Sequence, residues 1–362
     1  MNINKNGAIL ITTLWIITVL SALCVSVAHR SAVTLKLSSY QTDKLKAFFL
    51  AKAGIVYALA QKSLEYAKGY PDTIDALNQP WANNPELFKK HAFNKGSYSL
   101  YYGDDPVLFG LADESSRINI NTASPDVFID LLLACEEDET QAYEIAYCIV
   151  DWRDADDAIG TDPYNNSFLG AEGEYYLGLD NPYYCKNKNF EIVEELLLVK
   201  GITAEIFSKI KDFITIYTEG EVNINTASET ALFAVFGVDY PDLPLKVAAY
   251  RKGRDGVIGT RDDRWFSTGP YIIDRGKEGM VEIKNLQEQD WFGNIYGITN
   301  QEYDRMRQLL KGSDEGIKIT AGSKIYRATA EGEIEKVVSR IEAVYEFRQG
   351  ERLPVTRFWH QE

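Results

Sequence analysis

The chain has 362 residues, a formal net charge of −15 and 45% hydrophobic residues, which is enough for two or three compact units. Its acidity argues against a nucleic-acid partner, because phosphate contacts need clustered lysine and arginine. Three histidines, His29, His91 and His360, leave little material for histidine-based catalysis or a histidine-rich metal site. The sequence contains no HExxH motif, P-loop or nucleophile elbow, so we expect no enzymatic activity.

The chain starts with a seven-residue polar segment, MNINKNG, and continues with an uncharged apolar run from Ala8 to Ala28. About 20 apolar residues span a bilayer as a helix, so residues 8–28 predict a transmembrane helix. The helical pattern then becomes amphipathic and runs without proline to about Tyr66. A single helix that begins in lipid and continues into water is typical of a pilin-like subunit.

This start resembles type IV pilins and pseudopilins. The resemblance implies that residues 1–7 are a leader, that prepilin peptidase cuts after Gly7, and that the new terminus at Ala8 is methylated. The usual family pattern has a glutamate at the fifth mature position, which is Thr12 here. In the fibre that carboxylate pairs with the terminal ammonium of a neighbouring subunit, and a buried carboxylate without its partner is costly. Thr12 therefore favours a subunit at the fibre tip; the alternative is a neutral replacement without meaning.

The flanking charges and the pilin resemblance disagree about the orientation of this helix. Lys5 stands against Arg30, Lys36, Lys44 and Lys46, so the positive-inside rule weakly favours an outside N-terminus. The resemblance implies the opposite, and we follow it. We expect a single-pass inner-membrane protein with a cytoplasmic N-terminus and most of its chain in the periplasm.

Three of the four cysteines would then lie in an oxidising compartment, where one disulfide can form. Cys24 lies in the apolar run, and the other three are Cys135, Cys148 and Cys185. The sequence alone does not choose the pair. We predict Cys135 with Cys148, because a helical hairpin would bring them together.

Residues 113–218 and 219–313 read as two copies of one pattern. The copies open with RININTASPDVFIDLLL and EVNINTASETALFAVFG, in which Ser124 and Ser228 are placed as helix N-caps. Each copy continues with a second helix ending in arginine and an Asp- and Gly-rich loop. Each then closes with an acidic and apolar helix, a Gly-Ile-Thr turn and a last helix, as in FEIVEELLLVKGITAEIFSKIKDFITIY and VEIKNLQEQDWFGNIYGITNQEYDRMRQLL. This predicts a duplicated helical domain rather than a solenoid.

The two helical copies resemble helix-hairpin-helix (SAM-like) domains, many of which bind DNA through a glycine-rich hairpin that holds a phosphate. Here the hairpins are ACEEDETQ and FGVDYPDLP, which are acidic and would repel phosphate. We therefore interpret the copies as structural and expect no nucleic acid.

The two acidic loops are candidate calcium sites, because Ca²⁺ takes six to eight oxygen ligands from flexible loops. Neither loop contains cysteine or histidine, which disfavours zinc, and neither has the spacing of an EF-hand. The alternatives are solvated turns rich in Asp and Gly, or a glycosidase acid–base pair, for which no substrate cleft is evident. The candidate ligands are Asp151, Asp154, Asp156, Asp157, Glu172 and Glu174 in the first loop, and Asp255, Asp262 and Asp263 in the second.

Strand patterns flank the helical copies on both sides. Residues 95–105 and the following VLFGLADES predict one or two strands after a loop at 70–94. Further strands are predicted at 324–333, 335–351 and 353–361, with hairpin turns at Glu331–Glu333 and Gln349–Glu351. The fold class is therefore α+β: a pilin-like fold, with a long N-terminal helix on an antiparallel sheet, interrupted by a large duplicated helical insertion.

The expected organisation is a leader (1–7), a membrane helix (8–28), its periplasmic continuation (29–66), strands and loop (67–112), two helical copies (113–218 and 219–313) and C-terminal strands (314–362). In this order the chain resembles the general secretion pathway protein K family of type II secretion. The motifs that carry the resemblance are AILITTLWIITVL, FFLAKAGI, DESSRININTAS, DWRDADD, GAEGEYY and VEELLLVKGIT.

The resemblance implies a non-catalytic minor pseudopilin at the pseudopilus tip, which starts assembly and supports protein export across the outer membrane. It also implies a complex with two other minor pseudopilins, of the I and J types, and calcium bound in the helical domain. The alternatives are a DNA-binding pilin of an uptake machine and an adhesive minor type IV pilin.

Overall fold

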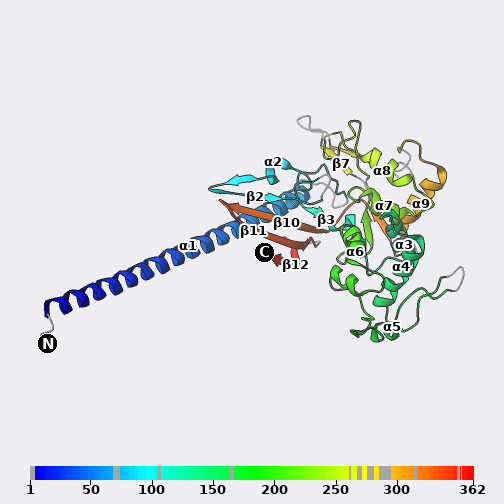
Figure 1. Ribbon diagram of the computed structural model, residues 1–362. Helices are drawn as coiled ribbons and strands as arrows, with labels where there is room; N and C mark the ends of the chain where they lie inside the picture. The colour runs from blue at the N-terminus through cyan, green and yellow to red at the C-terminus, as the bar shows by residue number, and fades with distance from the viewer. Residues whose placement is uncertain are drawn as a thin grey trace.

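The computed structural model describes residues 5–67, 74–103, 107–162, 167–260, 262–266, 271–274, 281–284, 295–312, 316–348, 351 and 353–362. A long helix, α1 (Lys5–Ala67), projects from a sheet, and a larger helical mass lies at the other end of that sheet (Figure 1). Two separate hydrophobic cores form, one between α1 and the sheet and one inside the helical mass.

The predicted N-terminal helix is confirmed as one continuous element. In the described part of the chain it is the one helix long and apolar enough to cross a membrane. Its apolar side chains from Ile9 to Val27 are exposed, whereas Ala47, Ala51, Ile55 and Ala58 are buried against the sheet. Small residues spaced by three and four positions let the helix approach the strands closely.

The sheet is antiparallel and has the order β1-β2-β10-β11-β12, with the short β3 also paired to β10. Along β10, alternate residues such as Tyr326, Ala328 and Ala330 are buried against α1, as the period of a strand requires. A short helix, α2 (Pro85–Phe88), leads into β1, so part of the predicted loop at 70–94 is ordered structure. The strands are β1 (His91–Phe93), β2 (Gly96–Leu100), β3 (Ala112–Asp113), β10 (Ile325–Ile334), β11 (Val337–Glu346) and β12 (Val355–Gln361).

The hairpin turn predicted at Glu331–Glu333 is wrong, because β10 continues through it to Ile334. The turn instead lies at Glu335, which has a positive φ of 53°. Gly332 is required for another reason: a Cβ there would come within 2.0 Å of the Ala47 carbonyl oxygen on α1. In the second predicted turn, residues 349 and 350 lie outside the described residues.

The helical insertion begins after β3 with the 3₁₀ turn η1 (Glu114–Ser116) and returns to the sheet through β9 (Lys318–Thr320). Each copy begins with a strand in a short parallel pair: β4 pairs with β5 inside the first copy, and β6 of the second copy pairs with β9, which follows that copy. Helices α3 and α7 pack against each other and join the two copies. The first copy contains β4 (Ile118–Asn119), α3 (Pro125–Ala134), α4 (Glu139–Arg153), α5 (Gly173–Leu177), η2 (Val193–Leu198), α6 (Ala204–Ile210), η3 (Lys211–Phe213) and β5 (Ile214–Thr215); the second contains β6 (Glu221–Asn223), α7 (Glu229–Phe236), α8 (Leu243–Arg251), β7 (Tyr271–Asp274), β8 (Val281–Lys284) and α9 (Asn300–Lys311).

Equivalent residues make equivalent contacts in the two copies. Arg153 donates to the carbonyl oxygens of Ile120 and Ala123 in the first NINTAS turn. Arg251 donates to Ile224 and Ala227 in the second turn, at 2.9 and 2.7 Å. The arginine that ends each second helix therefore holds the turn that starts its own copy.

The last asparagine of each NIN motif also repeats its role. The Asn121 side chain exchanges two hydrogen bonds with the backbone of Phe190, and Asn225 does the same with Phe266. The N-cap prediction holds fully for Ser228, whose Oγ accepts from Ala231 N at 3.1 Å. Ser124 occupies the N-cap position but its side chain makes no capping hydrogen bond.

Two predicted helices have other structures. In the first copy the acidic and apolar segment forms the 3₁₀ helix η2, followed by the Gly-Ile-Thr turn and α6. In the second copy Val281–Lys284 is a strand paired with β7, because its alternating residues suit a hairpin. Residues 285–294 lie outside the described residues.

Candidate metal centre

Three carboxylates of the first acidic loop meet at one point. Oxygen atoms of Asp154, Asp156 and Glu172 lie within 4.8 Å of one another. Asp154 is the C-cap of α4 and Glu172 is the N-cap of α5, so the ends of two helices position these side chains. The loop between them brings together residues separated by 18 positions, which the sequence pattern alone only suggested.

Asp151 supports this cluster from the last turn of α4. Its side chain is buried, and both carboxylate oxygens accept from Gly160 N, at 3.2 and 3.1 Å. A Cβ at position 170 would lie 1.7 Å from Asp151 Oδ2, so Gly170 is needed for the chain to pass. The glycines of the loop thus allow its backbone to wrap a buried carboxylate.

Among the described residues, the negative charge of the cluster is only partly compensated by hydrogen bonds. Glu172 is 4% exposed, and within the described part of the chain neither of its carboxylate oxygens has a hydrogen-bond partner. Burial, and then the charge of Asp151, raises the pKa of Glu172 to about 7. Burial also raises the pKa of Asp151 to about 6 and that of Asp154 above its usual value. Buried carboxylates with raised pKa values and free oxygens need either protons or a cation.

The donor set fits a hard divalent cation. Among the described residues, the three side chains that gather here all offer carboxylate oxygens, and Ca²⁺ takes such oxygens at flexible loops. The sequence analysis missed Asn187, which adopts a positive φ of 46° and donates to the Asp156 carbonyl and the Asp157 carboxylate. Its Oδ1 is buried without a partner among the described residues. An asparagine 15 positions after Glu172, outside the acidic run, gives no sequence signal for this role.

Two predicted ligands lie apart from the cluster. Asp157 accepts from Asn187 at 3.2 Å, so it helps to hold that residue. Glu174 is the second residue of α5, and its side chain is exposed. Within the described residues, Asp154, Asp156 and Glu172 are therefore the predicted ligands of this loop that meet closely enough to share an ion.

The second acidic loop also gathers its carboxylates but satisfies them differently. Oxygen atoms of Asp255, Asp262 and Asp263 lie within 4.8 Å of one another. Asp262 accepts from the backbone N–H of Arg254 and Asp255, and Gly259 N donates to Asp263 at 2.7 Å. A hydrogen bond from Thr260, followed by that from Arg254 N, lowers the pKa of Asp262 to about 2. This loop folds around its own hydrogen bonds, and its use as a metal site stays a prediction.

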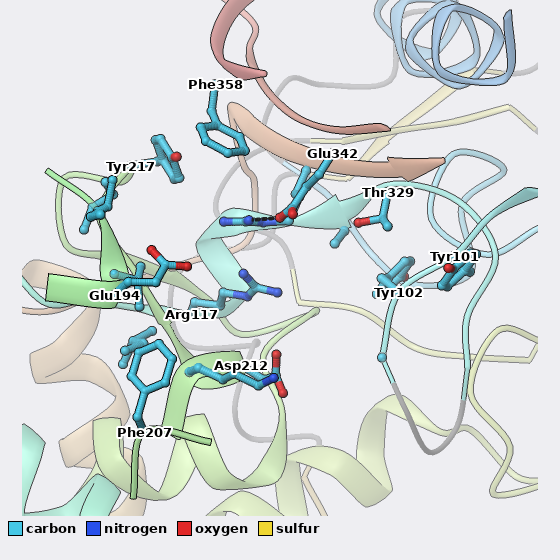
Figure 2. A pocket seen from close by; sticks show the side chains of 18 residues that line it. Tyr101, Tyr102, Arg117, Glu194, Phe207, Asp212, Tyr217, Thr329, Glu342 and Phe358 are labelled. Carbon is cyan, nitrogen blue, oxygen red and sulfur yellow. Dashed lines mark hydrogen bonds and ion pairs between the residues drawn. The ribbon is translucent and has the colours of Figure 1, made fainter. Parts of the chain in front are cut away.

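A separate cleft of about 490 Å³ lies between the sheet and the first helical copy. Figure 2 shows Glu342, Thr329 and Phe358 from the strands on one side and Phe207 and Asp212 from the helical copy on the other. Arg327 forms ion pairs with Glu342 and, at 2.6 Å, with the buried Glu114. The pair between Arg327 on β10 and Glu114 on η1 therefore links the sheet to the start of the insertion at this cleft.

Comparisons with known proteins cover most of the chain. The family model described as type II secretion system, protein K matches residues 108–219. The type II secretion system protein K of Pseudomonas aeruginosa is 27% identical over 267 residues, which cover 73% of this chain and 77% of that protein. The protein K of Aeromonas hydrophila is 25% identical and covers 61% of this chain and 67% of its own length. Over the first helical copy and most of its length, the chain is thus similar to type II secretion system proteins K.

The fold of the chain agrees with a solved structure. The matched chain belongs to the crystal structure of the GspK-GspI-GspJ complex from enterotoxigenic Escherichia coli. The TM-score is 0.60 at 16% identity, and the match covers 90% of this chain and 99% of that chain. The predicted pilin-like fold with an inserted helical domain is thereby confirmed.

The remaining residues that the sequence analysis singled out lie on α1. Gly7 and Ala8 fall in its first turns, and their side chains lie outside the described residues. Thr12 is exposed to the surroundings of the helix, and its hydroxyl donates to the Ile9 carbonyl at 2.9 Å. An intrahelical hydrogen bond of this kind satisfies the hydroxyl in an apolar environment.

The predicted pairing of Cys135 with Cys148 is absent, because all four cysteines are free thiols. Cys135 caps the end of α3 near the Lys209 carbonyl, whereas Cys148 is buried on α4 with its Sγ 3.6 Å from the Leu169 carbonyl. The two thiols face different neighbours, so the hairpin between α3 and α4 does not bring them together.

Proposed function

We propose that this chain is a non-catalytic minor pseudopilin that sits at the tip of the type II secretion pseudopilus. There it starts assembly and supports protein export across the outer membrane. The observation that carries the proposal is a helical insertion with its own core at the end of the sheet away from the apolar half of α1 (Figure 1). Such a mass is too bulky to be stacked between the repeating subunits of a fibre.

Thr12 supports the same position. A subunit inside the fibre uses a carboxylate at this place to neutralise the terminal ammonium of its neighbour, and here an uncharged hydroxyl bonds within its own helix. A subunit with no neighbour above it has no such charge to neutralise. An unpaired carboxylate in lipid would cost several kcal/mol, so the tip is where a neutral residue is favoured.

The proposal includes the partners and the membrane orientation. Prepilin peptidase would cut after Gly7 and leave Ala8 as the methylated N-terminus, with that end in the cytoplasm and the sheet and insertion in the periplasm. The matched crystal structure carries I- and J-type subunits in its name, and we propose minor pseudopilins of these two types as the partners here. The exposed apolar side chains of α1 suit packing beside partner helices and the inner membrane.

The proposal also includes Ca²⁺ at the first acidic loop. Asp154, Asp156 and Glu172 would hold the ion, with Asp151 and Asn187 as supporting or additional oxygen donors. The ion would neutralise the mutually repelling carboxylates and tie the C-terminal end of α4 to α5. This role is structural, because it fixes the shape of the first helical copy.

Gene deletion and complementation test the tip role. We expect the deletion strain to lose pseudopili, or to form them without control, and to stop exporting its substrates. The wild-type gene should restore export, and Thr12→Glu should restore it poorly, whereas Thr13→Ser, a neighbouring change without charge, should restore it fully. Normal export in the deletion strain would refute the proposal.

A further inference from the structure

Four segments that are distant in sequence meet at a buried polar cluster where the insertion joins the sheet. We define the junction node as Lys62, Asp75, Asp113, Asn223, Thr226, Ser323 and Tyr326. Its first half couples α1 to the returning strand. Lys62, from the last turns of α1, pairs with Asp75, and both side chains are buried. Asp75 also accepts from Ser323 N at 2.7 Å and from the Tyr326 hydroxyl at 2.9 Å.

The second half of the junction node couples the sheet to the insertion. Asp113 lies on β3, where the chain leaves the sheet, and its Oδ2 accepts from the Ser323 hydroxyl at 2.6 Å. The same oxygen accepts from Thr226 Oγ1 at 2.6 Å and from Asn223 Nδ2 at 2.9 Å, both in the second helical copy. Ser323 thus bridges two buried carboxyl groups through its backbone and its side chain.

The charges of the junction node do not balance. It holds the two carboxyl groups of Asp75 and Asp113 but the one ammonium group of Lys62. Burial raises the pKa of Asp113 from 3.8 to about 6, and the charge of Asp75 adds to this effect. Among the described residues, Tyr326 on β10 lies opposite Asp113 in the strand register and donates to Asp75. Burial, followed by the charge of Asp113, raises the pKa of Tyr102, which lies after β2. An ionised Asp113 therefore leaves a buried negative charge without a counter-charge in the node.

We propose that the junction node is a lock that couples the helical insertion to the membrane-proximal helix, and that the proton on Asp113 sets how tightly this lock holds. A protonated Asp113 balances the node, because Asp75 and Lys62 then form a neutral pair. Loss of the proton adds a buried charge at the point where the chain enters the insertion, and local opening hydrates that charge. The lock does not depend on the tip role or on the partners.

The direction of the pH effect follows from the raised pKa. A carboxyl group with a raised pKa in the folded state adds stability that is full below its unfolded pKa and is lost as the pH rises through the folded value. With pKa values of 3.8 in the open state and about 6 in the closed state, the opening equilibrium should rise roughly tenfold between about pH 5 and pH 8.

Hydrogen exchange read by mass spectrometry tests the lock on the full chain in detergent. Excess Ca²⁺ is kept constant so that the acidic loops do not titrate. We expect peptides that cover residues 112–117, 221–227 and 318–326 to lose about tenfold in protection factor from pH 5 to pH 8, after correction for intrinsic exchange. Peptides from α3, in the core of the first copy, should change by less than twofold.

Two variants separate the lock from a general effect of charge. Asp113→Asn should abolish the pH dependence at the junction, whereas Asp212→Asn, which removes one exposed carboxylate on η3, should keep it. The proposal fails if wild-type junction peptides change no more than those of α3, and this comparison decides even if Asp113→Asn does not fold. It also fails if a folded Asp113→Asn variant keeps the wild-type pH dependence.

Discussion

At the scale of single residues, one arginine in each helical copy holds the turn that starts that copy. Arg251 is 7% exposed and donates to two carbonyl oxygens of the turn that precedes α7. Burial lowers its pKa to about 10, which still leaves the guanidinium charged at neutral pH. Its hydrogen bonds satisfy carbonyl groups that the turn itself leaves unpaired.

We expect Arg251→Ala to reduce the free energy of unfolding by about 2–4 kcal/mol, because two charge-assisted hydrogen bonds to buried carbonyls are lost. Urea denaturation of the full chain in detergent, followed by circular dichroism, measures the change. Arg254→Ala, which removes an exposed arginine three residues later, should change stability by less than about 0.5 kcal/mol. Equal losses in the two variants would contradict the holding role of Arg251.

The carboxylates of the first acidic loop make stability depend on pH and on calcium together. Glu172 has a pKa raised to about 7 and Asp151 one raised to about 6, so their protonated forms stabilise the fold at low pH. That contribution is lost as the pH rises through these values. A bound cation removes the repulsion and favours the ionised ligands instead.

With excess chelator, the thermal midpoint should therefore fall between about pH 5 and pH 8. With millimolar Ca²⁺ the fall should disappear or reverse, and the difference between the two conditions should be greatest at pH 8. Differential scanning fluorimetry gives both curves. Glu172→Gln should flatten the chelator curve and weaken the response to Ca²⁺, whereas exposed Glu174→Gln should behave as wild type. A response that is the same in all three chains would contradict the assigned cluster.

At the scale of secondary-structure elements, close contact between α1 and β10 sets how the helix packs on the sheet in the pilin-like half. A Cβ at position 332 would lie 2.0 Å from the Ala47 carbonyl and 2.7 Å from Ala51 N. Backbone atoms of a helix cannot move aside as a flexible side chain can. The glycine in the middle of this long strand is therefore a requirement of packing and no sign of a turn.

Gly332→Ala should lower the free energy of unfolding by about 2–3 kcal/mol, because the added methyl group separates α1 from the sheet. Gly173→Ala is the matched change, since a Cβ there meets no atom within 4 Å. Chemical denaturation of both variants should show a large loss for the first and little change for the second. A neutral Gly332→Ala variant would show that α1 is not packed so closely.

The elements that the sequence predicted best are those with strong local signals. The apolar run predicted α1, and the repeated NINTAS motif with its following apolar periodicity predicted α3 and α7. The errors arose where tertiary contacts decide. Gly332 looks like a turn residue in the sequence but lies in a strand under α1, and Val281–Lys284 pairs as a strand although its pattern also suits a helix.

The candidate site was predictable in composition but not in detail. The run of Asp residues after α4 and the returning Glu172 indicated one ion, and the structure brings three of these carboxylates together. Asn187 was missed because its place depends on the backbone path after α5. Glu174 was included in the prediction although its side chain is exposed and does not belong to the group of three carboxylates. Which carboxylates of a loop share an ion depends on how close they lie in three dimensions, and residue type alone does not reveal this.

At the scale of the whole molecule, two halves with separate hydrophobic cores are joined by a buried polar node. One half carries the apolar helix and the sheet, and the other carries the duplicated helical insertion (Figure 1). The acidic loops belong to the insertion, so calcium should act on that half and leave α1 and the sheet folded. Limited proteolysis in chelator should cut first between residues 154 and 190, and added Ca²⁺ should protect this segment. Cleavage that begins in the sheet would contradict this division.

Co-purification of the full chain tests the central claim most directly. The tagged protein is expressed with the I- and J-type minor pseudopilins and the major pseudopilin of the same secretion system and is extracted in mild detergent. The account predicts a stable complex that contains both minor subunits and little major pseudopilin. A Thr12→Glu variant should still form this complex, because the periplasmic contacts with the minor subunits are unchanged. Recovery of the chain with the major subunit alone, or with neither minor subunit, would contradict it.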